Sequence, residues 1–285
     1  MTTADQRTRF LFDSFAIRGE IVRLDASFAT VLGNHAYPPV IARQLGECMA
    51  AAALLTGTLK FEGQLILQAK GAGPLTLLMA ECSHDGRLRG IAHHEGTCDD
   101  APLAALLGAQ GGNGHLAITI EPLAGQRYQG IVPLDGESLA ECIEHYFAQS
   151  EQLSTRLWLL TEGHRAAGLL LQELPGTPAS ERDGDAWNRA CRLADTLTAS
   201  ELLDLPAEAL LHRLYHQEDV RVFPGEALAF GCTCSRERTL RMLASLGRAE
   251  IRGIIEEQGR IEVSCEFCRR QYLFDAADVA GLLSG

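Results

Sequence analysis

The sequence has no apolar run long enough to cross a membrane. Its longest candidate, residues 49–55, falls far short of the roughly 20 residues that a membrane-spanning helix needs. The N-terminus also lacks the uninterrupted apolar core of a secretory signal, because charged residues interrupt it. These residues are Asp5, Arg7, Arg9 and Asp13. We therefore expect a cytoplasmic protein with no membrane partner.

Positive charge is scarce as well. Lys and Arg number 25 against 37 Asp and Glu, which gives a formal net charge of −12. Binding to nucleic acid depends largely on positive side chains that neutralise phosphates. The segment from Cys232 onward has eight Arg and eight Asp or Glu, so it offers no basic patch either. We expect no specific nucleic-acid partner, and the hydrophobic content of 46% is ample for a folded core.

Cysteine, by contrast, is plentiful and clustered. Four of the nine cysteines form a C-x-C pair, Cys232 and Cys234, and a C-x-x-C pair, Cys265 and Cys268. Two thiols this close can reach one ion from a single turn, and two such turns complete the tetrahedral site typical of structural zinc. Because cytosolic thiols are kept reduced, the cluster predicts one zinc ion rather than structural disulfides. The C-x-C pair is crowded and could also close a strained disulfide.

Other candidate ligands and nucleophiles are isolated. His93 and His94 are adjacent in a predicted strand and therefore point to opposite faces. His212 and His216 have helical ligand spacing, but the metalloprotease pattern around them is absent. We interpret all four histidines as lying outside any metal site. The remaining cysteines are interpreted as core or incidental residues, with Cys98, in a polar loop, expected to be the most reactive. They are Cys48, Cys82, Cys98, Cys142 and Cys191.

The first 175 residues combine strand and helix periodicities. Pro38 and Pro39 open a helix that ends near Leu55, and a second helix follows the capping box of Ser138 and Glu141. Segments of period two surround turn sequences and predict three hairpins. They are 74–81 with 87–94, 115–121 with 127–132, and 155–160 with 167–174. A further strand is expected over 59–69 with a break at Gly63, and 8–31 reads as a short strand with a following segment. The pattern predicts an α+β fold, with helices covering an antiparallel sheet.

A linker rich in Pro, Gly and Ser is predicted over residues 174–185. Beyond it lie amphipathic helices, with a capping box at Thr198 and Glu201 and a helix start at Pro206; they have no core of their own and should lie against the sheet domain. The last segment predicts two short helices ending at glycines, two strands flanking the C-x-x-C pair, and a final helix capped by Asp275. Because this segment has few large apolar side chains, it needs a cross-link such as a bound metal ion to stay folded. We expect a core domain over 1–175, a linker with helices over 176–231, and a small zinc-binding domain over 232–285.

Six blocks of the sequence form a characteristic set, at residues 34–38, 59–63, 146–153, 213–216, 232–238 and 265–268. These blocks resemble the heat shock protein 33 family of redox-regulated bacterial chaperones. They occur in the family's order and span essentially the whole chain. Ser154 departs from the pattern, because the family more often has proline there; the difference concerns a turn and leaves the cysteines untouched.

The resemblance implies a holdase chaperone, not an enzyme, that is inactive while reduced and zinc-bound. It implies that oxidation converts Cys232, Cys234, Cys265 and Cys268 into two disulfides and that zinc leaves. The C-terminal redox-switch domain and the linker then unfold, and the protein binds unfolding clients, as a homodimer when oxidised. Four cysteines allow three pairings. The family points to Cys232–Cys234 and Cys265–Cys268, and neighbours within a cluster would also meet most often once zinc has gone.

Two alternatives stay open on the residues alone. The first is a structural zinc module on an α+β domain that mediates partner contacts. The second is an enzyme, but a thiol oxidoreductase usually places its C-x-x-C in a βαβ context. A zinc hydrolase needs an open ligand position, which four thiolates would close. Zinc release by peroxide together with a gain of holdase activity would separate the chaperone from both.

Overall fold

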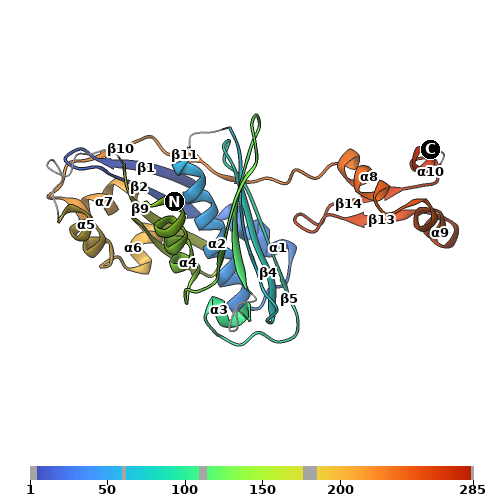
Figure 1. Ribbon diagram of the computed structural model, residues 1–285, viewed down its shortest axis with the longest axis horizontal. Coiled ribbons are helices and arrows are strands. Elements are labelled where there is room, and N and C mark those ends of the chain that lie inside the picture. The colour runs from blue at the N-terminus through green and yellow to red at the C-terminus, as the bar shows by residue number, and fades with distance from the viewer. Residues whose placement is uncertain (1–4, 60–61, 109–113, 176–184, 284–285) are drawn as a thin grey trace. The chain divides into compact units, whose positions relative to one another are not determined.

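Two six-stranded sheets and one long helix organise most of the chain (Figure 1). The structure is a computed structural model that describes residues 5–59, 62–108, 114–175 and 185–283. It divides into two compact units, Met1–Phe230 and Gly231–Gly285, which we call unit 1 and unit 2. The predicted α+β class is confirmed. The prediction of a separate linker between 176 and 231 stays a prediction, and most of the predicted 174–185 stretch lies outside the described residues.

The first sheet, sheet A, has the strand order β10-β1-β2-β9-β8, with β11 also paired to β1. All of its pairings are antiparallel. Residues 8–31, expected to hold one strand, in fact contain most of β1, all of β2 and most of the helix α1 (Ala26–Asn34). The strands are β1 (Gln6–Phe12), β2 (Ile17–Leu24), β8 (Thr155–Glu162), β9 (Arg165–Glu173), β10 (Val220–Val222) and β11 (Glu226–Ala227).

The second sheet, sheet B, has the order β12-β5-β4-β3-β6-β7. Two of the three predicted hairpins, β4–β5 and β6–β7, lie here, and the third, β8–β9, lies in sheet A. The short pair β12–β5 is parallel. The strand expected from Leu59 begins only at Gly63. The strands are β3 (Gly63–Lys70), β4 (Leu75–Ser83), β5 (Arg87–His94), β6 (His115–Pro122), β7 (Tyr128–Pro133) and β12 (Ala229–Phe230).

The helix α2 (Pro39–Thr58) lies between the two sheets and contacts strands of both (Figure 1). Pro39 occupies the first turn, where its missing N–H costs nothing. The run Ala50–Ala53 is fully buried, because small side chains let the helix approach a sheet on each side. The shorter helical elements that follow in this unit are α3 (Leu103–Leu106), α4 (Leu139–Tyr146) and the π-helical turn η1 (Phe147–Glu151). Ser138 caps α4 as predicted, but Glu141 accepts from the Glu137 amide, so the reciprocal half of the capping box is wrong.

The opposite face of sheet A is covered by α5 (Ala186–Ala194), α6 (Ala199–Asp204) and α7 (Ala207–Tyr215). Strand β9 shows why both faces are covered. Its Ala166 and Leu170 belong to the core around α2, whereas Ala167, Leu169 and Leu171 belong to a second core with α5–α7. The prediction that these helices lie against the sheet domain is confirmed, as is the capping box at the start of α6.

Unit 2 contains α8 (Arg236–Ala244), α9 (Arg248–Gln258), the hairpin β13 (Ile261–Ser264) and β14 (Gln271–Phe274), and α10 (Ala280–Leu283). Gly259 ends α9 in the left-handed conformation at φ 74°. Asp275 accepts from the amides of Ala277 and Asp278, so it caps a turn, and the final helix begins later than predicted. No helix among the described residues is both long and apolar enough to span a membrane.

Candidate metal centre

The four clustered cysteines meet in unit 2. One Sγ atom from each of Cys232, Cys234, Cys265 and Cys268 lies within 4.8 Å of the others. The Sγ atoms of Cys232 and Cys265 are 3.6 Å apart, and those of Cys234 and Cys268 are 3.4 Å apart. A tetrahedron with metal–sulfur bonds of about 2.3 Å has edges of about 3.8 Å. The donor set and its spacing therefore fit one zinc ion.

A turn and an extended segment position the two cysteine pairs. Cys265 and Cys268 lie in the turn between β13 and β14, where the Cys265 amide donates to the Arg270 carbonyl over 2.9 Å. Arg269 closes this turn with a φ of 58°, a left-handed conformation that a non-glycine residue adopts only under constraint. Cys232 and Cys234 lie in the extended segment just before α8. Ser235 caps that helix by accepting from the Arg238 amide, which fixes the end of the segment.

Three side chains around the cluster were not singled out from the sequence. The Tyr272 hydroxyl donates to the Cys234 Sγ over 3.1 Å. Arg238 donates to the Thr233 hydroxyl, and Arg236 donates to the Leu273 carbonyl and pairs with Asp278. Groups that orient metal ligands in this way tune metal affinity. The alternation of β14 could have placed Tyr272 on the core side, but its partner sulfur comes from a distant segment.

The electrostatics of the cluster favour a bound cation if all four thiols ionise. Burial opposes ionisation of Cys234, but hydrogen bonds from Tyr272 and the neighbouring thiols lower its pKa to about 7. Burial and the nearby sulfurs raise the pKa of Cys268 to about 12. Adjacent like charges disfavour one another. Four thiolates can therefore coexist here only with a positive charge among them.

The other buried cysteines are chemically quiet. Cys48, Cys82, Cys142 and Cys191 are all buried in unit 1. Burial raises the pKa of Cys82 to about 11 and that of Cys191 to about 12, and it also raises the pKa of Cys142. Since the thiolate is the form that reacts with oxidants, these four residues are poor targets.

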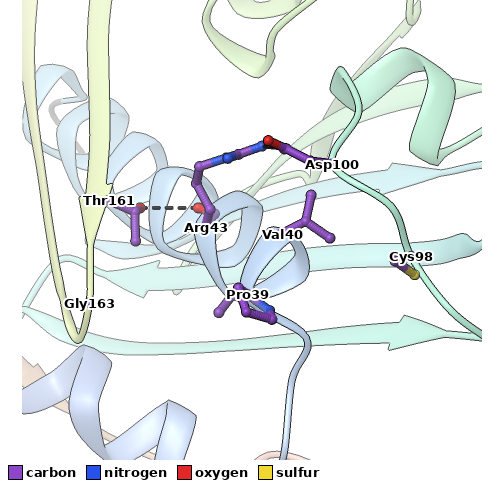
Figure 2. Close-up of a pocket in the computed structure, with 8 residues that line it drawn as sticks. Pro39, Val40, Arg43, Cys98, Asp100, Thr161 and Gly163 are labelled. Carbon is purple, nitrogen blue, oxygen red and sulfur yellow. Dashed lines mark hydrogen bonds and ion pairs between the residues drawn. The ribbon is translucent and has the colours of Figure 1, made fainter.

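Cys98, expected to be the most reactive of the isolated cysteines, lies half-buried beside a pocket of about 480 Å³ (Figure 2). Arg43 pairs with Asp100 there, and Thr161 donates to the Arg43 carbonyl over 3.0 Å. The polar groups that line the pocket thus satisfy one another, and no second thiol belongs to the lining. Cys98 has no sulfur partner within this pocket.

The histidines form no metal site among the described residues. His212 and His216 are exposed on α7 with ring centroids 6.1 Å apart, and no third ligand joins them. His93 is exposed at the end of β5, whereas His94 is half-buried. The interpretation of these residues as lying outside a metal site stays a prediction.

Comparisons with known proteins agree with the resemblance. The family model described as "Hsp33 protein" matches residues 5–275. The 33 kDa chaperonin of Ectopseudomonas mendocina is 56% identical over 99% of this chain and 96% of its own length. That of Pseudomonas aeruginosa is 50% identical over 100% of this chain and 96% of its own length.

A solved structure shows the same fold. The crystal structure of the 33 kDa chaperonin (heat shock protein 33 homolog) from Thermotoga maritima superposes with a TM-score of 0.79. The alignment covers 98% of each chain at 22% sequence identity. With the family model matched across nearly the whole sequence, these findings show that the chain belongs to the Hsp33 family.

Proposed function

We propose that this chaperone is a redox-regulated holdase, switched on by oxidation of its cysteine cluster. The observation that carries the proposal is the meeting of four Sγ atoms within 4.8 Å in a unit with a very small core. That core consists of six buried apolar side chains: Leu243, Ile251, Ile261, Tyr272, Phe274 and Val279. A core of this size rarely holds a domain without a staple. Membership of a chaperone family supports the proposal.

Cys232, Cys234, Cys265 and Cys268 are the residues that would hold zinc. When bound, zinc would supply the positive charge that the four thiolates need and a link between the segments before α8 and after β13. Arg236, Arg238 and Tyr272 hold those segments and the Cys234 sulfur in place. Folding and metal binding of unit 2 are then one event.

Oxidation by a peroxide removes the ligands in a balanced reaction. A thiolate of one pair attacks a peroxide oxygen, and the O–O bond breaks to give a sulfenic acid and hydroxide. The neighbouring thiolate attacks the sulfenic sulfur, the S–S bond forms, and a second hydroxide leaves. Each disulfide thus consumes one peroxide. Disulfide sulfurs are weak metal donors, so the link between the two segments is lost.

Loss of this link should spread toward unit 1 along the chain. The residues just before Cys232 are held by the two-residue strands β11 and β12. Glu226 of β11 pairs with the buried Arg7 of β1. Once these strands separate, α5–α7 are held by their packing and by side-chain hydrogen bonds to sheet A. Their release would expose Phe10, Phe12 and Leu169, an apolar face able to bind unfolding proteins.

The proposal extends to partners and setting. Unfolding client proteins are the expected partners, and the resemblance also implies a homodimer when oxidised. Self-association would cover part of the apolar face released by α5–α7. A net charge of −12 opposes nucleic-acid binding, and a thiol switch suits the reducing cytoplasm. No catalytic role is assigned to any residue.

One observation favours the second candidate, a structural zinc module for partner contacts. Three large apolar side chains of unit 2 are exposed, namely Met242, Leu246 and Leu273. They could form a contact surface that needs zinc only for folding. In that case peroxide would abolish partner binding, whereas the redox switch predicts that peroxide creates binding.

The experiment compares zinc content and holdase activity in one sample. Protein purified without oxygen is treated with peroxide, released zinc is followed with a chromophoric chelator, and suppression of aggregation of a thermally unfolding enzyme is measured. We expect one zinc per chain before treatment, and zinc release in step with gain of activity. Cys265→Ser should hold less zinc, whereas the matched control Cys98→Ser should behave like wild type. Full activity of the reduced, zinc-loaded protein would contradict the proposal.

A further inference from the structure

The large exposed apolar side chains of unit 1 are concentrated on one hairpin. Among the described residues of this unit, Leu123, Tyr128 and Ile131 are the large hydrophobic residues that are prominently exposed, at 73%, 47% and 61%. All three belong to β7 or to the turn between β6 and β7. Scattered exposed residues need no explanation, but a set gathered on one edge of a sheet marks an interaction surface.

Strand β7 is the last strand of sheet B, so one of its sides faces no other described strand. The Leu134 amide donates to the Gly114 carbonyl, and hydrogen-bonded pairs alternate along an antiparallel ladder. With the observed register, Tyr128, Gly130 and Val132 therefore direct their backbone groups toward β6. Gln129 and Ile131 direct theirs to the open side. Two donors and two acceptors are thus available for a further strand.

A cavity lies next to this edge on the inner face of the hairpin. It has a volume of about 330 Å³ and a mainly apolar lining. Ile118 and Ile120 of β6, Tyr128 of β7, and Tyr146 and Phe147 of α4 and η1 contribute to it. Its polar rim is already satisfied, because Glu151 accepts from the Tyr128 and Tyr146 hydroxyls over 3.1 and 2.7 Å. Arg18 at the rim donates to Gln172 and to the Thr58 carbonyl. What the cavity can still accept is an apolar side chain.

We propose that the open edge of β7 and the adjacent cavity bind an extended apolar segment of another polypeptide, which adds to sheet B as a seventh strand. Backbone hydrogen bonds to Gln129 and Ile131 would hold the segment. Because side chains alternate along a strand, one would point to the cavity beside Tyr128 and the next would pack on Ile131. Pro133 has no N–H, which limits the added strand to the part of β7 before it.

The chemistry of the β7 edge indicates which kind of segment it would bind. Native proteins usually protect such an edge with charge, and here the central outward side chain is Ile131. An extended segment matches both the unpaired backbone groups and the two apolar positions on opposite faces. That such segments come from unfolding clients rests on the proposed function, in which the reduced state is inactive, so binding at this edge alone does not prevent client aggregation. The edge is present in the folded chain, however, and it is separate from the sheet A face covered by α5–α7.

Peptide binding to the reduced, zinc-loaded full chain tests the proposal. The probe is a fluorescently labelled peptide with the sequence Lys-Thr-Val-Phe-Val-Thr-Lys, which presents apolar side chains on both faces of a strand. Its binding is followed by anisotropy and by the amide signals of β7. We expect saturable binding that Ile131→Lys weakens at least about tenfold through lost apolar contact and added charge. Ile131→Pro should do the same by removing an outward N–H while leaving the bonds to β6 intact. Leu246→Lys, an equivalent change in unit 2, should leave binding unchanged.

Several results would overturn the proposal. They are absence of saturable binding to wild type, equal affinity for Ile131→Lys, and shifts confined to signals outside β7. A dimer of the reduced chain that Ile131→Lys dissociates and the peptide cannot displace would assign the edge to a second copy instead. If Ile131→Pro fails to fold, Ile131→Lys still decides. Peroxide-induced holdase activity is measured in parallel, so that failure of the redox switch and failure of the β7 site are distinguishable.

Discussion

At the scale of single residues, the four cysteines share one site, and two short sulfur–sulfur contacts cross between the two pairs. Cys232 lies 3.6 Å from Cys265, and Cys234 lies 3.4 Å from Cys268. The predicted disulfides, Cys232–Cys234 and Cys265–Cys268, instead join sequence neighbours. The structure therefore supplies a definite competitor to the predicted pairing.

We expect the pairing within each cluster to dominate after full oxidation. A bridge between the clusters would close a long loop and keep unit 2 constrained, worth roughly 3 kcal/mol or more. Bridges within the clusters close very short loops and leave the unit free to unfold, as the switch requires. Peptide mapping of peroxide-treated protein checks this, with alkylation of the reduced form as control. A dominant Cys232–Cys265 or Cys234–Cys268 bridge would contradict the prediction.

A second residue-scale feature is a buried carboxyl group in sheet A. Glu20 is 1% exposed, and burial raises its pKa to about 7, although Arg7 and Arg9 act in the opposite direction. In the unfolded chain this group has an ordinary pKa near 4.5. Between these two values the folded state binds more protons than the unfolded state, so the free energy of unfolding falls as pH rises.

Glu20→Gln should remove this penalty. We expect the variant to be more stable than wild type by about 2–3 kcal/mol at pH 8 and nearly equal to it at pH 4.5, because glutamine mimics the protonated acid. Thermal unfolding of the reduced protein across this pH range measures the difference. Burial raises the pKa of Glu47 to about 7 as well. Glu47→Gln is therefore the matched variant, whose stability should depend on pH in the same direction. A stability difference that does not change with pH would show that Glu20 does not titrate in this range.

At the scale of elements, local rules predicted what local interactions decide. The side chain of Thr198 accepts from the Glu201 amide and that of Glu201 accepts from the Thr198 amide, so the start of α6 was readable from two residues. The hairpins around Asp85-Gly86 and Gly163 could be predicted for the same reason, because each depends on a local turn sequence. Contacts between distant segments were not: the parallel β12–β5 pair and the hydrogen bond from Tyr272 to Cys234 depend on the assembled fold.

Helix α7 is the element whose packing should set the threshold of the switch. Leu210 is fully buried between α7 and sheet A. Its replacement by alanine leaves a cavity and should cost about 2–5 kcal/mol of packing energy. We expect Leu210→Ala to show holdase activity while still reduced and still zinc-loaded, measured by suppression of aggregation without peroxide.

The exposed His212 on the same helix provides the control. His212→Ala should leave the reduced protein inactive, because this side chain contributes little to the core. If Leu210→Ala lowered the unfolding temperature but stayed inactive until oxidised, detachment of α5–α7 would not be what exposes the client-binding face.

At the scale of the whole molecule, the cysteine spacing led to the prediction of a small C-terminal domain from Cys232, and the second compact unit begins at Gly231. The middle segment was harder to predict from the sequence. Residues 176–231 were expected to form a linker whose helices lie against the sheet domain, and helices α5–α7 do share a core with sheet A in unit 1. An amphipathic face on α5 or α7 shows that a helix needs a partner, but it does not show how tightly that partner holds it.

Hydrogen exchange before and after peroxide treatment tests how the three regions differ. We expect residues 232–283 to lose protection first, because their small core depends on the four cysteines. Helices α5–α7 should follow, because their stability comes from packing on one face of sheet A. Strands β3 and β6 should keep their protection, because Leu65 and Ile118 are buried in the large core around α2. Persistent protection of α5–α7 after zinc loss would break the proposed route from oxidation to client binding. Loss of protection in β3 as early as in β13 would instead mean global denaturation, since a reversible switch requires that unit 1 retain a folded base on which the helices can reassemble.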